Sequence, residues 1–153
     1  MQSTKKFESP FSFLSSDVVE LNIQNSMPYD SLNGDVDRNF KFDYKIISNY
    51  EKDGARYGGI ALTFQAVVQK MNKNIMELRA VIHGHFTAGI NFVNAEEFGQ
   101  LLEYNGVTAL YGISRGILTS ISSIAFTTEV VRLPMLNIGK VIESKHKAEN
   151  SNE

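Results

Sequence analysis

The sequence has 153 residues, of which 42% are hydrophobic and 21% charged, the balance of an ordinary globular domain. Its formal net charge is −2, so the clustered basic excess of proteins that bind nucleic acid is absent. There is no cysteine, which excludes disulfides, thiolate metal sites and cysteine nucleophiles and fits a reducing, cytoplasmic compartment.

The two ends of the chain are polar and the middle reads as one domain. Glu8 and Pro10 interrupt any apolar run near the N-terminus, so this segment does not read as an export signal. We expect residues 1–10 to be a flexible N-terminus, residues 11–142 to form the domain and residues 143–153 to be a disordered tail.

Alternating apolar and polar side chains predict four strands. The first covers residues 11–24 and would place Val19, Leu21 and Ile23 on one face. The other three cover residues 39–47, 60–69 and 75–87. Each has one polar face, so we expect an antiparallel sheet that is open to water on one side.

Segments rich in turn-forming residues separate these strands. Residues 25–39 are too many for a tight hairpin and are expected to cross over part of the sheet. Residues 48–59 read as a polar turn region with three glycines, and residues 70–74 as a short turn.

Two helices are predicted after the last strand. The first covers residues 96–104, with Asn94 as a plausible N-cap and two acids in the first turn. The second, residues 105–128, has the sequence NGVTALYGISRGILTSISSIAFTT. Arg115 at its centre argues against a membrane span, because a charge at mid-bilayer costs at least ~2.5–3.5 kcal/mol.

The long helix has two stripes at helical spacing, one of larger apolar side chains and one of small residues. The larger side chains, which we expect to bury against the sheet, are Leu110, Ile113, Ile117, Ile121 and Ile124. The second, which we call the small stripe, consists of Ala109, Gly112, Gly116, Ser120 and Ser123. A glycine in a helix interior costs about 1 kcal/mol relative to alanine, and close packing of a second backbone is the simplest reason for two of them.

The predicted order of four strands followed by helices is that of an α+β domain. Residues 130–142 are apolar but contain Pro134 and Gly139, so we expect them to be extended. One long and one short helix can hardly cover such a sheet and also hide the small stripe. We therefore expect a homo-oligomer in which the small stripe joins subunits.

Candidate chemical groups are few. His83 and His85 share one strand face and are the best metal-like pair, but no third ligand is predictable, so we expect no metal site. Asp43 and Glu77 do not read as a catalytic pair, and we expect no enzyme activity and no cofactor. We interpret Arg115 as a helix residue that reaches a carboxylate or a carbonyl.

Apolar residues also occur in segments that a monomer would struggle to bury. They lie in the predicted crossover and after the long helix, and they can either cap the core or form a groove for extended, unfolded peptides. As candidate client-binding residues we take Met27, Pro28, Tyr29, Leu32, Phe126, Val130, Val131, Leu133, Pro134 and Met135.

The chain resembles the SecB family of export chaperones, most strongly over residues 75–138. Gly84-His-Phe86 looks like the family's Gly-x-Phe strand end, and residues 105–123 are similar to its long-helix block, with Tyr111 at the aromatic position and Arg115 at the arginine. Leu-Pro-Met-Leu-Asn-Ile, residues 133–138, is similar to the closing segment of the family.

This resemblance implies a four-stranded antiparallel sheet and a long helix, assembled as a dimer of dimers with helices between sheets. It implies an ATP-independent holdase whose client groove corresponds here to residues 27–32 and 126–135. Partners would be unfolded or partly folded proteins and the motor SecA, with no nucleic acid and no membrane insertion. Two departures are Gly112, where the family usually has proline, and a C-terminal helix truncated to residues 140–147 or missing.

Two alternatives stay open. SecB-like chaperones also occur as dedicated partners of toxin–antitoxin pairs, where they guard an unstable antitoxin. In a different class, the chain would be a small-molecule-binding or enzymatic α+β domain that uses His83, His85 and the sheet face.

Overall fold

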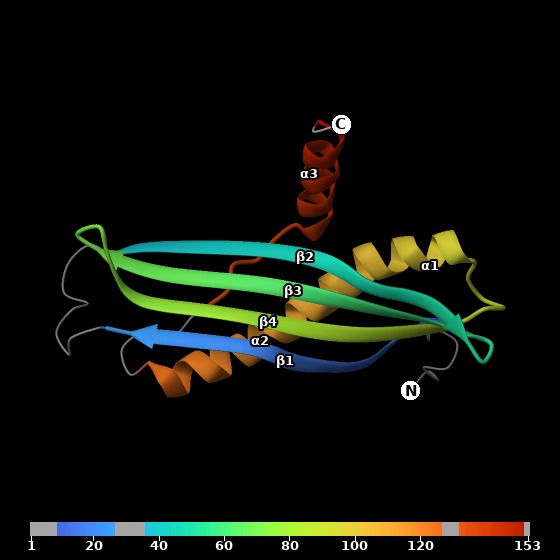
Figure 1. Ribbon diagram of the computed structural model, residues 1–153, viewed down its shortest axis with the longest axis horizontal. Coiled ribbons are helices and arrows are strands. Elements are labelled where there is room, and N and C mark those ends of the chain that lie inside the picture. Colours follow the sequence, from blue (N-terminus) through green and yellow to red (C-terminus); the bar gives the residue numbers. More distant parts are fainter. Residues whose placement is uncertain (1–8, 27–35, 127–131, 152–153) are drawn as a thin grey trace, which may run out of the picture.

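The computed structural model describes residues 9–26, 36–126 and 132–151 (Figure 1). Its strands are β1 (Phe11–Asn25), β2 (Asp37–Lys52), β3 (Ala55–Lys70) and β4 (Lys73–Gly89). The helical elements are α1 (Ala95–Leu101), a π turn η2 (Leu102–Gly106), α2 (Val107–Ala125) and α3 (Ile138–Asn150). This arrangement confirms the predicted α+β class with a four-stranded antiparallel sheet and a long helix. Within the described part of the chain, no helix is long and apolar enough to cross a membrane.

The strands follow the order β1-β4-β3-β2, and every neighbouring pair is antiparallel. Asp53 and Gly54 join β2 to β3 with φ of 50° and 76°, and Met71 and Asn72 join β3 to β4 with φ of 50° and 60°. Positive φ at both central residues is the geometry that matches the twist of a hairpin. The expectation of a turn over residues 48–59 is wrong, because the Asp-Gly turn needs two residues and the strands pair up to it.

Strand β1 has two register shifts, between Phe13 and Ser15 and between Val18 and Glu20. Leu21 and Ile23 pair with buried residues of β4, as strict alternation predicts. Val19 lies within a shift and has no partner residue, so its predicted place on the face of Leu21 and Ile23 is not supported. An extra residue on one strand interrupts the two-residue period locally, and single-sequence alternation does not reveal it.

One face of the sheet holds the core. Its central side chains come from alternate positions of β3 and β4 and are almost fully buried: Ile60, Leu62, Phe64, Met76, Leu78, Ala80, Ile82 and Phe86. Figure 1 shows α1, η2 and α2 as one helical run across a single face of the sheet. The run begins with the predicted cap, since the Asn94 side chain accepts from Glu97 N and the Glu97 carboxylate accepts from Asn94 N.

Glycines let this helical run approach the sheet. A Cβ on Gly58 would lie 2.6 Å from Leu102 Cδ2, and a Cβ on Gly84 would lie 2.8 Å from Leu110 Cδ1. Leu102 and Leu110 are completely buried in the hollows above these glycines. Gly58 therefore serves close packing and not the turn that the sequence suggested.

Helix α2 presents a different face to the sheet from the one predicted. Its buried residues are Val107, Leu110, Tyr111, Ser114, Leu118 and Ser122. Of the expected Ile/Leu stripe only Leu110 is buried, and Ile124 is 86% exposed. Tyr111 can bury its ring because its hydroxyl finds an acceptor, and its position turns the isoleucines to the flank of the helix.

The C-terminal part of the chain also differs from expectation. Residues 143–150 belong to α3 and are not a disordered tail, and the helix is longer than the 140–147 remnant that the resemblance suggested. Asn137 starts it, because its side chain accepts from Lys140 N. Gly139 lies in the first turn, where a glycine interrupts little, so the expected extended segment ends at residue 137.

Candidate functional site

The segment after α2, residues 132–137, is held against α2 by two side chains. Tyr111 and Arg115 are four residues apart and therefore lie one above the other on the same side of the helix. The Tyr111 hydroxyl donates to Pro134 O at 2.8 Å, and Arg115 Nε donates to Leu133 O at 3.2 Å. The prediction that Arg115 reaches a carbonyl is confirmed.

Aromatic packing holds Tyr111 in place for this contact. Its ring meets Phe42 edge-on at 5.1 Å between centroids and lies 6.0 Å from Phe64. Burial raises the pKa of the Tyr111 hydroxyl, and the charge of Arg115 opposes the rise in part. The hydroxyl therefore keeps its proton and remains a donor at neutral pH.

The anchored segment turns one apolar side chain inward and one outward. Leu133 is 3% exposed, whereas Met135 is 81% exposed and its sulfur lies 2.7 Å from an Arg115 terminal nitrogen. Pro134 is also exposed. Buried Leu133 and the two backbone hydrogen bonds fix the position of the segment. The exposed thioether of Met135 then forms an adaptable apolar surface at a defined place.

The other candidate client-binding residues divide into two groups. Phe126 and Leu133 are both buried members of the core cluster, so these two cap the core, which is one of the two interpretations that the sequence allowed. Pro134 and Met135 remain at the surface. The remaining candidates lie outside the described residues: Met27, Pro28, Tyr29, Leu32, Val130 and Val131.

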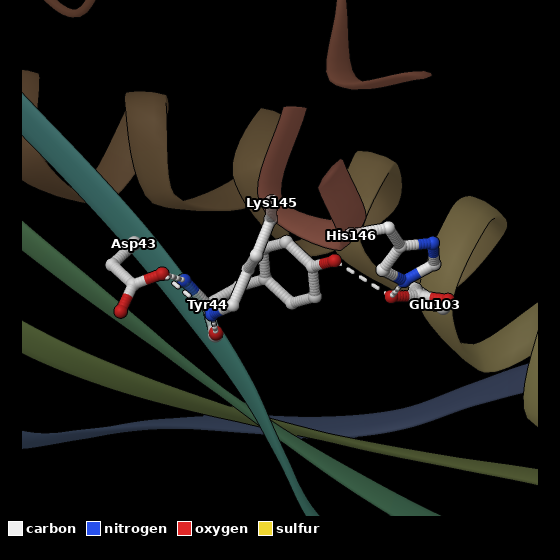
Figure 2. Close-up of polar contacts among 5 residues, drawn as sticks. All are labelled: Asp43, Tyr44, Glu103, Lys145 and His146. Carbon is white, nitrogen blue, oxygen red and sulfur yellow. Dashed lines mark hydrogen bonds and ion pairs between the residues drawn. The ribbon is translucent and has the colours of Figure 1, made fainter. Parts of the chain in front are cut away.

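A second polar cluster joins α3 to the sheet and to η2, and it was not predicted. Figure 2 shows Glu103 between Tyr44 and His146: its Oε1 accepts from the Tyr44 hydroxyl at 2.6 Å and lies 2.8 Å from His146 Nε2. Lys145 lies beside Asp43, with Nζ 2.7 Å from Oδ1 and 4.5 Å from the centroid of the Tyr44 ring. The only local signals in the sequence were the Asn137 cap and the apolar spacing of Ile138 and Ile142.

A groove lies between α3 and the edge strand β2. It has a volume of about 590 Å³ and is lined by Phe42, Asp43, Lys140, Val141, Ser144, Lys145, Ala148 and Glu149. Lys140 and Lys145 are balanced by Asp43 and Glu149, so the groove carries no net charge. Phe42, Val141 and Ala148 supply its apolar surface, which together with the cancelled charge suits an uncharged, extended chain better than a charged small molecule.

The buried Tyr44 hydroxyl makes stability sensitive to alkaline pH. Burial, followed by the hydrogen bond to Glu103, raises the pKa of Tyr44 above its ordinary value. The folded state therefore holds this proton more tightly, and the resulting stability is complete below about pH 10, the pKa of an unfolded tyrosine, and is lost at higher pH. Tyr44→Phe is expected to lower the free energy of unfolding by about 1.5–3 kcal/mol at pH 8.

Urea unfolding followed between pH 8 and pH 11 measures this effect. The wild-type protein should lose stability above pH 10 faster than Tyr44→Phe does, so the two curves converge. Tyr50→Phe, which removes a hydroxyl from an exposed ring, is the matched control. Parallel curves for wild type and Tyr44→Phe would show that the Tyr44 hydroxyl does not contribute to the alkaline loss.

The histidine pair lies on the sheet face opposite the helices. His83 and His85 pair with Asp17 and Ser15 of β1, and His85 Nε2 lies 4.0 Å from Asp17 Oδ2. Among the described residues, no group of three or more histidine, aspartate or glutamate side chains is arranged to hold a metal ion. Asp43 and Glu77 have different partners: Asp43 pairs with Lys145, and Glu77 accepts a hydrogen bond from the Gln65 side chain.

The small stripe lies on the side of α2 that faces away from the sheet. All five of its residues are exposed. A Cβ on Gly112 or on Gly116 would meet nothing within 4 Å among the residues that the structure describes. Within the described part of one chain, these two glycines therefore have no packing role.

Comparison with known proteins identifies a likeness in fold. No protein-family model matches the sequence, and no curated protein matches it. Among solved structures, one similar chain is the Mycobacterium tuberculosis SecB-like chaperone Rv1957, determined in complex with a ChAD peptide from the Rv1956 HigA1 antitoxin. The likeness has a TM-score of 0.60 at 10% identity and covers 83% of this chain and 91% of that one.

A second solved structure is a Streptococcus agalactiae protein of unknown function. It has a TM-score of 0.43 at 15% identity, and the match covers 82% of this chain and 97% of that one. The first likeness establishes that the chain has the fold of a SecB-like chaperone.

Proposed function

We propose that the protein is an ATP-independent holdase of the SecB type that acts in the cytoplasm. It binds extended segments of unfolded or partly folded proteins, among them preproteins that it passes to SecA. The observation that carries this proposal is the segment after α2, whose backbone is fixed by Tyr111 and Arg115 while Met135 is turned outward.

The exposed apolar surface favours a protein that binds many different polypeptide sequences rather than one small ligand. Met135 has rotatable bonds and a polarisable sulfur and adapts to different side chains. The neutral groove between α3 and β2 adds apolar surface on the neighbouring edge of the sheet. Neither feature requires a nucleotide, a cofactor or a catalytic group.

The assembly in this proposal is a homo-oligomer, a dimer or a tetramer built as a dimer of dimers. The exposed small stripe of α2 is its proposed contact, because two glycines there leave open space above the helix backbone. Close approach of a second helix would cover this surface and the half-exposed isoleucines beside it.

A dedicated chaperone of one antitoxin is the second candidate function. It is favoured by the SecB-like neighbour, which was determined with a peptide from an antitoxin. Affinity capture of the protein from cells of its own source tests it: one dominant small partner supports the dedicated function, whereas many unrelated preproteins contradict it.

Light scattering of a refolding, aggregation-prone protein tests the holdase proposal. Wild-type protein at several-fold molar excess, without nucleotide, should suppress aggregation. Met135→Asp is expected to weaken this suppression several-fold, because a buried client contact would then have to desolvate a carboxylate. Met71→Asp is the matched control, since Met71 is an equally exposed methionine, 89% exposed, in the β3–β4 turn.

Two results would contradict the proposal in different ways. Aggregation that proceeds unchanged with wild-type protein would rule out a general holdase. Equal loss of suppression in Met135→Asp and Met71→Asp would show that the segment after α2 has no particular role in client binding.

A further inference from the structure

On the outer edge of β2, side chains of the protein itself occupy both the backbone N–H and the backbone C=O of Tyr44. In an antiparallel sheet, alternate residues of an edge strand turn both their N–H and their C=O away from the neighbouring strand. Tyr44 is such a residue: its N–H donates to Asp43 Oδ1 at 2.8 Å, and its C=O accepts from Lys145 Nζ. The β3 side of Tyr44 is occupied by Leu62 in the register of the sheet.

Asp43 and Lys145 complete these contacts by pairing with each other at 2.7 Å. Together they offer Tyr44 one acceptor and one donor, which is what a residue on an added strand would offer. We call these two side chains the edge plug. Open strand edges invite pairing with other chains, and charged side chains at the edge are a common protection.

The element that supplies Lys145 is anchored by apolar side chains in its N-terminal half. Ile138 and Ile142 are the buried residues of α3, and both precede Lys145. Beyond Ile142, α3 meets β2 through Lys145, which contacts Asp43 and the Tyr44 ring, and meets η2 through His146 on Glu103. The contacts of Lys145 are therefore separate from the two apolar anchors of the helix.

We propose that the outer edge of β2 is a strand-addition site for an extended segment of a non-native polypeptide, and that the edge plug closes it in the free protein. This inference rests on the proposed function and specifies how a client backbone is bound. The two-residue period places the outward backbone groups of Phe40 and Phe42 on the same edge as those of Tyr44.

The groove beside β2 suits such a segment. Phe42 and Val141 line it and would contact every second side chain of the added strand. The client N–H replaces Lys145 at Tyr44 O, and the client C=O replaces Asp43 at Tyr44 N. The number of hydrogen bonds at Tyr44 is conserved, so affinity depends on the apolar contacts and on breaking the plug.

Binding of a model peptide to the full chain tests the proposal. The probe is a fluorescent, end-capped ten-residue peptide of alternating valine and threonine, compared with the same peptide N-methylated at every second residue. Lys145→Ala should bind the first peptide roughly two- to fivefold more tightly than wild type, because a partly exposed ion pair no longer has to break. Lys147→Ala, an exposed lysine of α3 outside the groove lining, should bind like wild type.

Backbone amides provide the decisive readout. With bound peptide, hydrogen exchange at Phe42 and Tyr44 should slow, and the N-methylated peptide should fail to bind. Binding that perturbs only residues 132–136 would overturn strand addition and leave the proposed holdase function standing. No binding to wild type or Lys145→Ala would overturn both. Self-association of Lys145→Ala without peptide binding would assign the edge to a second copy and overturn the client site.

Discussion

Gly116→Leu is expected to reduce the native mass of the proposed oligomer to that of a single protomer while the protomer stays folded. The small stripe is exposed, and a Cβ at residue 116 has no neighbour within 4 Å among the described residues of the chain. A leucine therefore meets no obstacle within one protomer. Where a second backbone packs closely against the stripe, the leucine side chain overpacks the contact and destabilises each such contact by about 1–3 kcal/mol or more. Native mass spectrometry measures the change.

Two further variants make this result specific. Ser123→Ala keeps the stripe small and should leave the native mass unchanged. Glu143→Leu places a leucine on an exposed position of α3, away from the stripe, and controls for added surface hydrophobicity. A Gly116→Leu protein with the wild-type mass would remove the small stripe from the interface, and a wild-type protein of single-protomer mass would contradict the oligomer.

Gly84→Val is expected to destabilise the fold by about 1–3 kcal/mol or more, because overpacking forces side chains or backbone to shift. Its Cβ would lie 2.8 Å from both terminal carbons of Leu110, which is completely buried under α2. The added atoms therefore push the helix away from the sheet. Urea unfolding measures the change, at one fixed protomer concentration because the apparent stability of an oligomer depends on that concentration.

A double-mutant cycle identifies the cause. Leu110→Ala alone should cost about 2–5 kcal/mol, since it leaves a cavity. Combined with Gly84→Val it should cost clearly less than the two single changes added together, because valine fills part of the space. Additive costs would show that Gly84 is needed for another reason.

The strands were the most predictable part of the fold. In β3 and β4 the alternation from Ile60 to Val68 and from Met76 to Phe86 matches the buried face, since both strands lie in the middle of the sheet with regular register through these residues. The edge strand β1 was less predictable. Its two register shifts interrupt the period, and an exposed edge tolerates apolar side chains that do not mark a buried face.

The buried face of α2 was predicted wrongly, because helical spacing alone does not determine which side of the helix packs against the sheet. The isoleucine stripe and the observed buried face overlap at Leu110 and then diverge. Tyr111 decides between them: its ring packs on Phe42, and its hydroxyl needs Pro134 O, a carbonyl more than twenty positions later in the chain. No local pattern contains that partner.

The candidate site shows the same division. Arg115 was identified as a helix residue that reaches a carbonyl, and Met135 as an apolar residue in an irregular segment. The contacts of Tyr44, Glu103 and Lys145 were not foreseen, because they join residues about 60 to 100 positions apart in the chain. Each looks like an ordinary surface or strand residue until the fold brings it to the others.

The sequence by itself determined the α+β order, the faces of the central strands, the Asn94 cap and the absence of cysteine chemistry. These depend on period, on neighbouring residues or on composition, which are local or global properties of the chain. The tertiary structure alone decided which side of α2 is buried, that α3 forms and docks, and that Asp43 and Lys145 close the edge of β2. Those features depend on which distant groups meet, because buried polar atoms require partners and close packing requires complementary shapes.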